Sequence, residues 1–186
     1  MLVISCHADT GFDAHRLARR GDGTLHGHLD NFAGVYAVMR AYFSGALDRG
    51  NVRIELTEGE ETDMAGAYRV RATLAPDDLV VVVDVTGVKT AADFTIEKCR
   101  LSELADFVAQ ALAGLDYELF ADSPDPISSD DEWDIYAETQ PFALFLGIPV
   151  AGGDYNEGEV SCREASLAAA AEALVRLARA HDEAWD

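Results

Sequence analysis

The sequence has few basic residues: 14 lysines and arginines stand against 34 aspartates and glutamates, which leaves a formal net charge of −20. A surface with this charge repels the phosphate backbone of nucleic acids, so we expect no general nucleic-acid binding. Only two of the basic residues, Lys89 and Lys98, are lysines. Most of the carboxylates are expected to be solvated, although a subset could bind metal ions.

Cysteines are also few. Cys6, Cys99 and Cys162 form no CxxC pair, which argues against a disulfide framework and against a cysteine zinc site. The longest apolar run, LVVVVDV, contains an aspartate and is much shorter than the roughly 20 residues that a membrane-spanning helix needs. No charged n-region with an apolar h-region stands before the first predicted strand, so we expect no export. We therefore expect a cytoplasmic protein that does not bind membranes.

Length and composition predict a single domain over residues 1–186. The chain is 49% hydrophobic and 26% charged, which is typical of globular proteins. A chain of this size can bury about two thirds of its unfolded surface. Neither an internal repeat nor a low-complexity linker divides the sequence.

Strand and helix patterns alternate in the first half. Strands are predicted at MLVISCHAD, NVRIELTEG and DDLVVVVDVTG, and helices between them at DNFAGVYAVMRAYFSGAL and DMAGAYRVRATL. The continuous apolar run of the third strand is typical of a parallel strand buried on both faces. This order predicts a three-layer α/β/α fold, with a mostly parallel mixed sheet and helices on both faces.

The second half adds a helix at SELADFVAQALAGL, a core strand at FALFLGIPV and a final helix at ASLAAAAEALVRLARAH, and YELFA is a candidate for a further strand. Residues 10–28 and 122–134 are predicted to be loops, because they combine glycines or prolines with many polar residues.

Helix caps and surface histidines can also be predicted. Asp30 and Ser102 are expected to be N-caps of two helices, and Ser161 with Glu164 three residues later matches a capping box before the final helix. His15 and His181 are expected to lie on the surface.

Polar side chains follow each predicted strand of the first half. The set consists of His7, Asp9, Asp30, Glu60, Glu61 and Asp84. Because the carboxyl ends of parallel strands meet at one edge of a sheet, we expect these side chains to lie together. Asp84 interrupts a run that should be buried, where an unpaired carboxylate is costly. The strand ends therefore predict a functional site.

An imidazole with several carboxylates is a ligand set for zinc, manganese or cobalt. The number of anions exceeds what one ion needs, so we expect two ions about 3.5 to 4 Å apart, bridged by one carboxylate. The i, i+2 spacing places His7 and Asp9 on one face of a strand, where Asp9 can orient the imidazole. Of the adjacent Glu60 and Glu61, one is expected to bind metal and the other to act as general base on metal-activated water.

The segments HAD, GHLDNFAGVYAVM, TEGEETDMAGA and VVVDVTG, in this order, resemble the zinc-dependent exopeptidase superfamily, the co-catalytic metallopeptidases that include aminopeptidases, carboxypeptidases and deacylases. The tail FALFLGIPVAGGDYNEGEVSCREASLAAAAEAL is similar to the closing strand, ligand loop and helix of that family. The resemblance implies a hydrolase that cleaves a peptide or related amide bond in a small peptide or an acylated amino acid.

The resemblance also implies a role for individual residues. His7 and Asp84 would bind one metal ion, and Asp30 would bridge the two ions. Glu61 would bind the second ion, and Glu60 would be the general base.

The sequence departs from the family pattern in the tail. The last metal ligand of the family is a histidine shortly before a Glu-Val pair, and GGDYNEGEV contains no histidine. Tyr155 stands at that position beside Asp154. Four residues are candidates for a substitute ligand: Asp154, Tyr155, His26 and His28. There is no inserted lid or dimerisation domain, so substrate selection is expected to depend on short loops such as residues 123–133.

Two alternatives stay open. A degenerate member of the same fold could have lost hydrolysis and serve as a binding or assembly module. A metal-independent α/β domain with a solvated acidic edge would bind no metal. Whatever the function, an exposed strand edge could pair with another subunit in a homo-oligomer.

Overall fold

The computed structural model describes residues 1–127 and 130–185 of the chain. The strands are β1 (Leu2–His7), β2 (Leu17–Arg19), β3 (Thr24–Gly27), β4 (Val52–Thr57), β5 (Leu79–Thr86), β6 (Phe94–Glu97), β7 (Tyr117–Leu119), β8 (Ala143–Ala151) and β9 (Val160–Arg163). The helices are α1 (Phe32–Phe43), α2 (Ala65–Arg71), α3 (Ser102–Ala111), α4 (Glu132–Ala137) and α5 (Glu164–Trp185).

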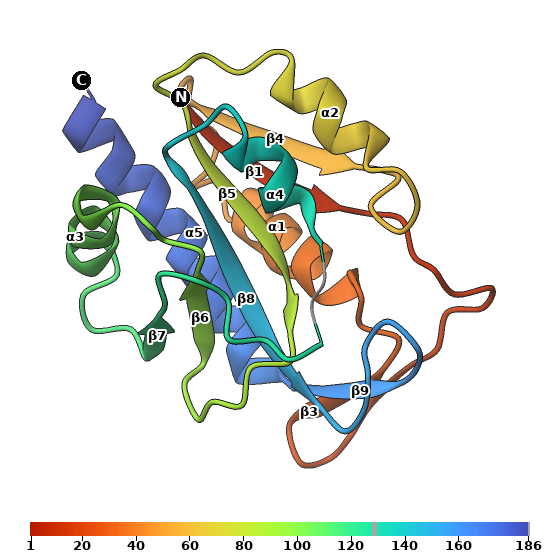
Figure 1. Ribbon diagram of the computed structural model, residues 1–186. Helices are drawn as coiled ribbons and strands as arrows, with labels where there is room; N and C mark the ends of the chain where they lie inside the picture. The colour runs from red at the N-terminus through yellow and green to blue at the C-terminus, as the bar shows by residue number, and fades with distance from the viewer. Residues whose placement is uncertain (128–129, 186) are drawn as a thin grey trace.

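The strands form one mixed sheet in the order β2-β3-β9-β8-β5-β1-β4, with β6 paired to β8 and to β7 (Figure 1). The four strands β8, β5, β1 and β4 are parallel. Strands β9, β3 and β2 extend the sheet in antiparallel pairs. The parallel centre confirms the predicted fold class, and the antiparallel flank makes up the mixed part of the sheet.

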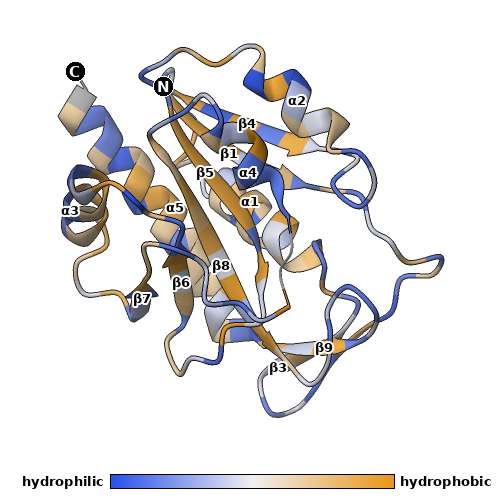
Figure 2. Cartoon of the chain, viewed as in Figure 1, coloured by the Kyte–Doolittle hydropathy of each residue, from blue (hydrophilic) through white to orange (hydrophobic). Residues whose placement is uncertain are grey.

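Helices cover both faces of the sheet, as the three-layer prediction requires. Figure 1 shows α2 and α4 in front of the sheet and α1 and α5 behind it. The larger core lies between the sheet and α1, α3 and α5, and a smaller core lies under α2 and α4. Every residue of β5 is buried, and Figure 2 shows β5 and β8 as mainly hydrophobic strands. None of the helices in the described part of the chain combines the length and apolarity that crossing a lipid bilayer would require.

The two segments predicted to be loops contain regular structure. Residues 17–27 form an antiparallel hairpin of β2 and β3, which joins the sheet through β9. Residues 132–134 belong to α4, and Asp131 and Asp134 form its capping box. These elements are short, and their stability comes from pairing or packing with distant segments, which a local pattern cannot reveal.

The predicted helix caps were wrong in three places. The N-cap of α1 is Asn31, whose Oδ1 accepts a hydrogen bond from the Gly34 N–H, and Asp30 precedes it. Helix α3 begins at Ser102 itself, after Leu101. Ser161 lies in β9, opposite His26 of β3, because strand pairing there outweighs the capping-box pattern.

His181 is also placed differently from its prediction. Its side chain is buried, with 1% exposure, near Asn51. Helix α5 packs against the sheet along most of its length, so the histidine faces inward even near the end of the chain.

The buried Asn31 gives a test of the fold beside the polar edge. Its Nδ2 donates to the Val83 carbonyl of β5 at 2.9 Å, while its Oδ1 caps α1. We expect Asn31→Ala to lower the free energy of unfolding by about 2 kcal/mol, because it removes a cap and a buried hydrogen bond. Urea unfolding followed by circular dichroism measures this change. Asn156→Ala, at an exposed turn, is the control, and equal stability of the two variants would contradict the role of Asn31.

Candidate metal centre

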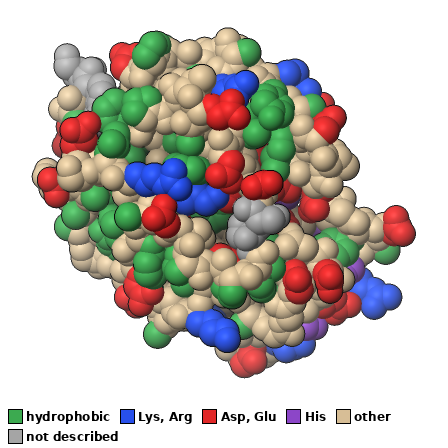
Figure 3. Space-filling view, in the orientation of Figure 1, with side chains coloured by type: hydrophobic (Ala, Val, Ile, Leu, Met, Phe, Trp, Pro, Cys, Tyr) green, Lys and Arg blue, Asp and Glu red, His purple; other side chains and the backbone are tan. Residues whose placement is uncertain are grey.

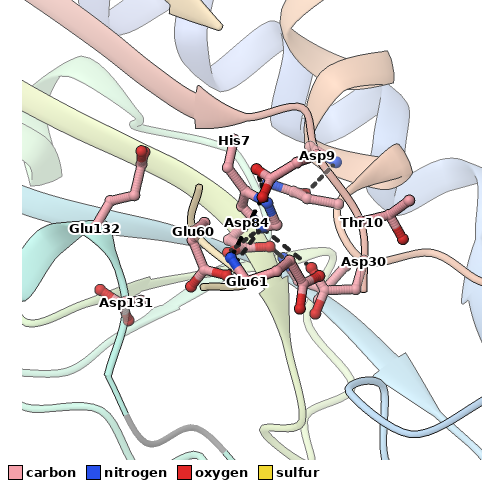
Figure 4. Close-up of polar contacts among 12 residues, drawn as sticks. His7, Asp9, Thr10, Asp30, Glu60, Glu61, Asp84, Asp131 and Glu132 are labelled. Carbon is pink, nitrogen blue, oxygen red and sulfur yellow. Dashed lines mark hydrogen bonds and ion pairs between the residues drawn. The ribbon is translucent and has the colours of Figure 1, made fainter. Parts of the chain in front are cut away.

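The six residues predicted at the strand ends come from neighbouring parts of the sheet. His7 ends β1, which lies between β4 and β5 in parallel register. Asp84 lies near the end of β5, and Glu60 and Glu61 follow β4 in a turn where Gly59 has a φ of +82°. Asp30 precedes α1. Figure 4 shows all six side chains, Asp9 included, gathered at this edge.

His7 is the centre of the cluster. Its Nε2 lies 3.1 Å from Asp30 Oδ1, 3.2 Å from Asp84 Oδ2 and 3.9 Å from Glu60 Oε2. Its Nδ1 lies 3.5 Å from Asp9 Oδ1. The side chain is 1% exposed, and neither ring nitrogen makes a well-directed hydrogen bond to the described residues. An imidazole this buried and this close to carboxylates needs a proton or a cation between them.

The electrostatics of His7 and Asp9 agree with this need. Burial alone lowers the pKa of His7, but the nearby Asp84 charge and the contacts with Asp30 and Asp9 outweigh it, so the pKa lies well above its usual range. The contact with His7 in turn lowers the pKa of Asp9 to about 2. The carboxylates that hold a proton on His7 would equally attract a divalent cation.

The other carboxyl groups repel one another. Burial, with Asp84 as the next cause, raises the pKa of Glu60 to about 8. Burial also raises the pKa of Asp84 to about 7, although His7 opposes the shift. The pKa of Glu61 is raised as well, first by burial and then by Asp30. These groups favour a positive charge among them.

The donor atoms fit a metal ion. Ligand atoms of His7, Asp30 and Asp84 lie within 4.8 Å of one another, as do those of His7, Glu60 and Glu61. One nitrogen and two carboxylate oxygens are a donor set that zinc and manganese accept. Both groups share His7, and the first is fully buried. The residues therefore fit a cation best at His7, Asp30 and Asp84.

Tyr155 is the first of the four candidates for a substitute ligand. It lines a small cavity together with Asp30, Glu60 and Asp84. Its hydroxyl donates to Asp125 Oδ2 at 2.9 Å, and burial, followed by the Asp125 charge, raises the pKa of the phenol. A neutral phenol engaged in this way is a poor metal ligand.

The remaining candidates do not belong to the metal-ligand groups found among the described residues. Asp154 is exposed and accepts from the Asn156 N–H. His26 contacts Ser161 and Glu159. His28 Nδ1 lies 2.9 Å from the Ala14 carbonyl, and its ring stacks on Phe12.

Several residues at this edge of the sheet were not predicted from the sequence. Asp131 lines the same small cavity and is held by Lys98, whose Nζ lies 2.8 Å from Asp131 Oδ2. Behind it, the buried Glu132 accepts a hydrogen bond from Ser5 Oγ at 2.8 Å, and burial raises the pKa of its carboxyl. Residues 131–134 read DEWD, and an aspartate with a second acid three residues later could have indicated a capped helix.

The comparisons with known proteins find structural similarity only. No protein-family model matches the sequence, and neither does any curated protein. Among solved structures, the TET aminopeptidase from the marine sediment archaeon Thaumarchaeota archaeon SCGC AB-539-E09 is 14% identical, with a TM-score of 0.70 over 88% of this chain and 51% of that one. The aminopeptidase APDkam598 from the archaeon Desulfurococcus kamchatkensis is 17% identical, with a TM-score of 0.69 over 92% and 52%.

A third structure, of the Pyrococcus horikoshii TET1 peptidase that can assemble into a tetrahedron or a large octahedral shell, is 17% identical, with a TM-score of 0.66 over 89% and 52%. At these identities the similarity shows the fold. The chain thus has the fold of these peptidases, which confirms the exopeptidase-like architecture expected from the resemblance. It spans about half of their length.

The raised carboxyl pKa values predict a pH-dependent stability. Glu60 and Asp84 keep their protons to about pH 8 and pH 7 when folded, but would lose them near their ordinary pKa values of 4.5 and 3.8 when unfolded. Their stabilising contribution is complete below the unfolded pKa values and is lost as the pH rises through the folded ones. Without divalent cations, we therefore expect the urea midpoint to fall between pH 5 and pH 8.

The control for this prediction is the same titration with zinc or manganese added. A bound cation favours the ionised carboxylates, so the decrease should become smaller, and Glu60→Gln should reduce it in the cation-free protein. A urea midpoint that is constant from pH 5 to pH 8 without cations would contradict the prediction.

Proposed function

We propose that this chain is a metal-dependent hydrolase of the exopeptidase type, with residues 1–186 as one catalytic domain. The observation that supports the proposal is the position of His7 Nε2, buried 3.1 and 3.2 Å from two carboxylate oxygens without a well-directed hydrogen bond among the described residues. A purely structural histidine would be expected to have its nitrogens hydrogen-bonded.

His7, Asp30 and Asp84 would hold the cation, and Glu61 would take part in a second site. Zinc is the expected ion, with manganese or cobalt as alternatives. A cation of this kind, when bound, polarises the substrate carbonyl and lowers the pKa of water. Asp9 lies on the far side of the imidazole, 3.5 Å from Nδ1, where it would fix the orientation of His7.

Glu60 would be the general base. Its carboxyl group lies beside the proposed ligands, 3.9 Å from His7 Nε2, and burial raises its pKa to about 8 in the absence of a cation. In its ionised form, which a nearby cation favours, the carboxylate can accept the proton of the attacking water and return it to the leaving amine. Glu60 is mostly buried but lines two cavities, so a substrate could reach it.

The substrate would be a small peptide or an acylated amino acid. The similar structures are named as aminopeptidases or a peptidase, and this supports cleavage of a peptide or related amide bond. One of them assembles into shells, and we extend the proposal to a homo-oligomer of this chain.

A second candidate function is a non-catalytic binding or assembly module of the same fold. It is favoured by Tyr155, which stands where the family pattern has a histidine ligand. The Tyr155 hydroxyl donates to Asp125, and the side chain offers no imidazole nitrogen to a second cation. This candidate predicts one cation or none per chain and no hydrolysis of aminoacyl or acyl-amino-acid substrates.

The general-base role predicts a separation of activity from metal content. Glu60→Gln should reduce turnover of aminoacyl or acyl-amino-acid amides by about 10²- to 10⁴-fold, while elemental analysis finds the metal content of the unchanged protein. His7→Ala and Asp84→Ala should lose metal, because each removes a donor from the buried group.

The matched control is Glu58→Gln, in the same turn, where the carboxylate is 73% exposed and pairs with Arg69. This variant should keep both metal and turnover. Full activity of Glu60→Gln would refute the mechanism. An unchanged protein that binds metal but cleaves none of the substrates would support the binding module.

A further inference from the structure

A row of aromatic rings crosses the surface beside the start of α1. Phe12 stacks on His28 with ring centroids 4.0 Å apart and planes 7° apart. His15 follows at 6.4 Å from His28, and Phe32 at 5.9 Å from His15. Tyr36 ends the row at 6.2 Å from Phe32. We call these five residues the aromatic row.

The aromatic row begins at the candidate metal centre. Gly11, which precedes Phe12, is so close to Glu61 that an added Cβ would lie 2.9 Å from Glu61 Oε2. His28 precedes Asp30 by two residues. The segments that carry Phe12 and His28 therefore border the carboxylate cluster.

The other end of the aromatic row borders a cavity of about 340 Å³. Phe32 and Tyr36 line it, together with the apolar side chains of Leu17, Leu25 and Leu167 and with Arg19, Arg40 and Glu164. Tyr36 is 41% exposed and Leu17 44% exposed. Large apolar groups exposed in one groove are a feature of binding surfaces.

Arginines gather at this end of the molecule. Four of the twelve, Arg16, Arg19, Arg20 and Arg40, lie in or beside β2 and in α1. Arg16 pairs with Glu159 and Arg19 with Glu164. In Figure 3, histidines and basic side chains lie near the lower right edge, with acidic side chains among them. The aromatic row thus lies between the carboxylate cluster and a cavity lined by Arg19, Arg40 and Glu164.

We propose that the aromatic row is a subsite for an extended peptide, with its free amine at the acidic cluster and its carboxylate toward the arginines. The inference rests on the proposed function and specifies its substrate class: peptides with bulky apolar side chains after the cleaved bond. Alternate side chains of an extended chain repeat every 6.6 to 6.8 Å or so. Successive rings from His28 to Tyr36 are 5.9 to 6.4 Å apart, so alternate side chains can pack on successive rings.

The experiment measures peptide binding without turnover, by calorimetry on zinc-loaded protein carrying Glu60→Gln. The probes are Ala-Ala-Phe-Ala-Phe and Ala-Ala-Ala-Ala-Ala. The phenylalanine peptide should bind more tightly, and Tyr36→Ala or Phe12→Ala should weaken it about 5- to 10-fold, as expected for the loss of one aromatic contact. Binding of the alanine peptide should stay the same.

Tyr42→Ala is the matched control, because Tyr42 lies on the same helix, is 48% exposed and is outside the aromatic row. It should leave the affinity for both peptides unchanged. Equal effects of Tyr36→Ala and Tyr42→Ala would overturn the subsite. A change of oligomeric state in Tyr36→Ala without a change in peptide affinity would also overturn it and make the row a subunit interface.

These outcomes are separable from those of the proposed function. If the unchanged protein cleaves Ala-Ala but the row variants bind both peptides normally, the hydrolase stands and the subsite fails. If the unchanged protein cleaves no substrate, and the phenylalanine peptide nevertheless shows the expected binding pattern, the proposed hydrolysis fails and the subsite stands.

Discussion

The arrangement of this molecule depends on holding several carboxylates around one buried imidazole. An isolated carboxylate in such surroundings would be destabilising, and adding further ones increases the repulsion. The carboxylates are held together by different elements of the fold: Asp84 lies on β5, Asp30 precedes α1, and Glu60 follows β4. The raised pKa values of Glu60 and Asp84 follow from this crowding of carboxyl groups and from their burial, and a cation among them would favour their ionised forms.

The positions of these residues could be predicted from the sequence because they depend on one rule. In a parallel sheet, strand ends share an edge, and the buried run that contains Asp84 made a parallel strand evident. Asp9 follows the end of β1, and its carboxylate lies 3.5 Å from the His7 imidazole, close to where the alternation of strand side chains would place it. None of this requires knowledge of the loops, so the sequence could predict that these side chains lie together even though residues 10–28 were not expected to form a hairpin.

The missed features depend on contacts between distant segments. Asp30 and Asn31 are both good helix caps, and only the placement of the Asp30 side chain among the carboxylates leaves Asn31 to cap α1. Ser161 fits a capping box, but β9 pairs with β3, which lies more than 130 positions earlier. Lys98 has no local signal at all: its importance comes from the ion pairs that hold Asp131 and Asp134 at the start of α4.

The hairpin of β2 and β3 connects the candidate metal centre to the rest of the sheet. The chain leaves β1 after His7 and returns to the sheet only through the pairing of β3 with β9, and three residues later it supplies Asp30. Both ends of this excursion are therefore fixed by strands, while Phe12 and His28 stack across it. A segment anchored in this way can expose aromatic side chains beside His7 and Asp30, the proposed metal ligands, while these two residues keep their positions. The same hairpin that places Asp30 thus also presents the surface next to it, so the proposed metal centre and the aromatic row share one structural origin.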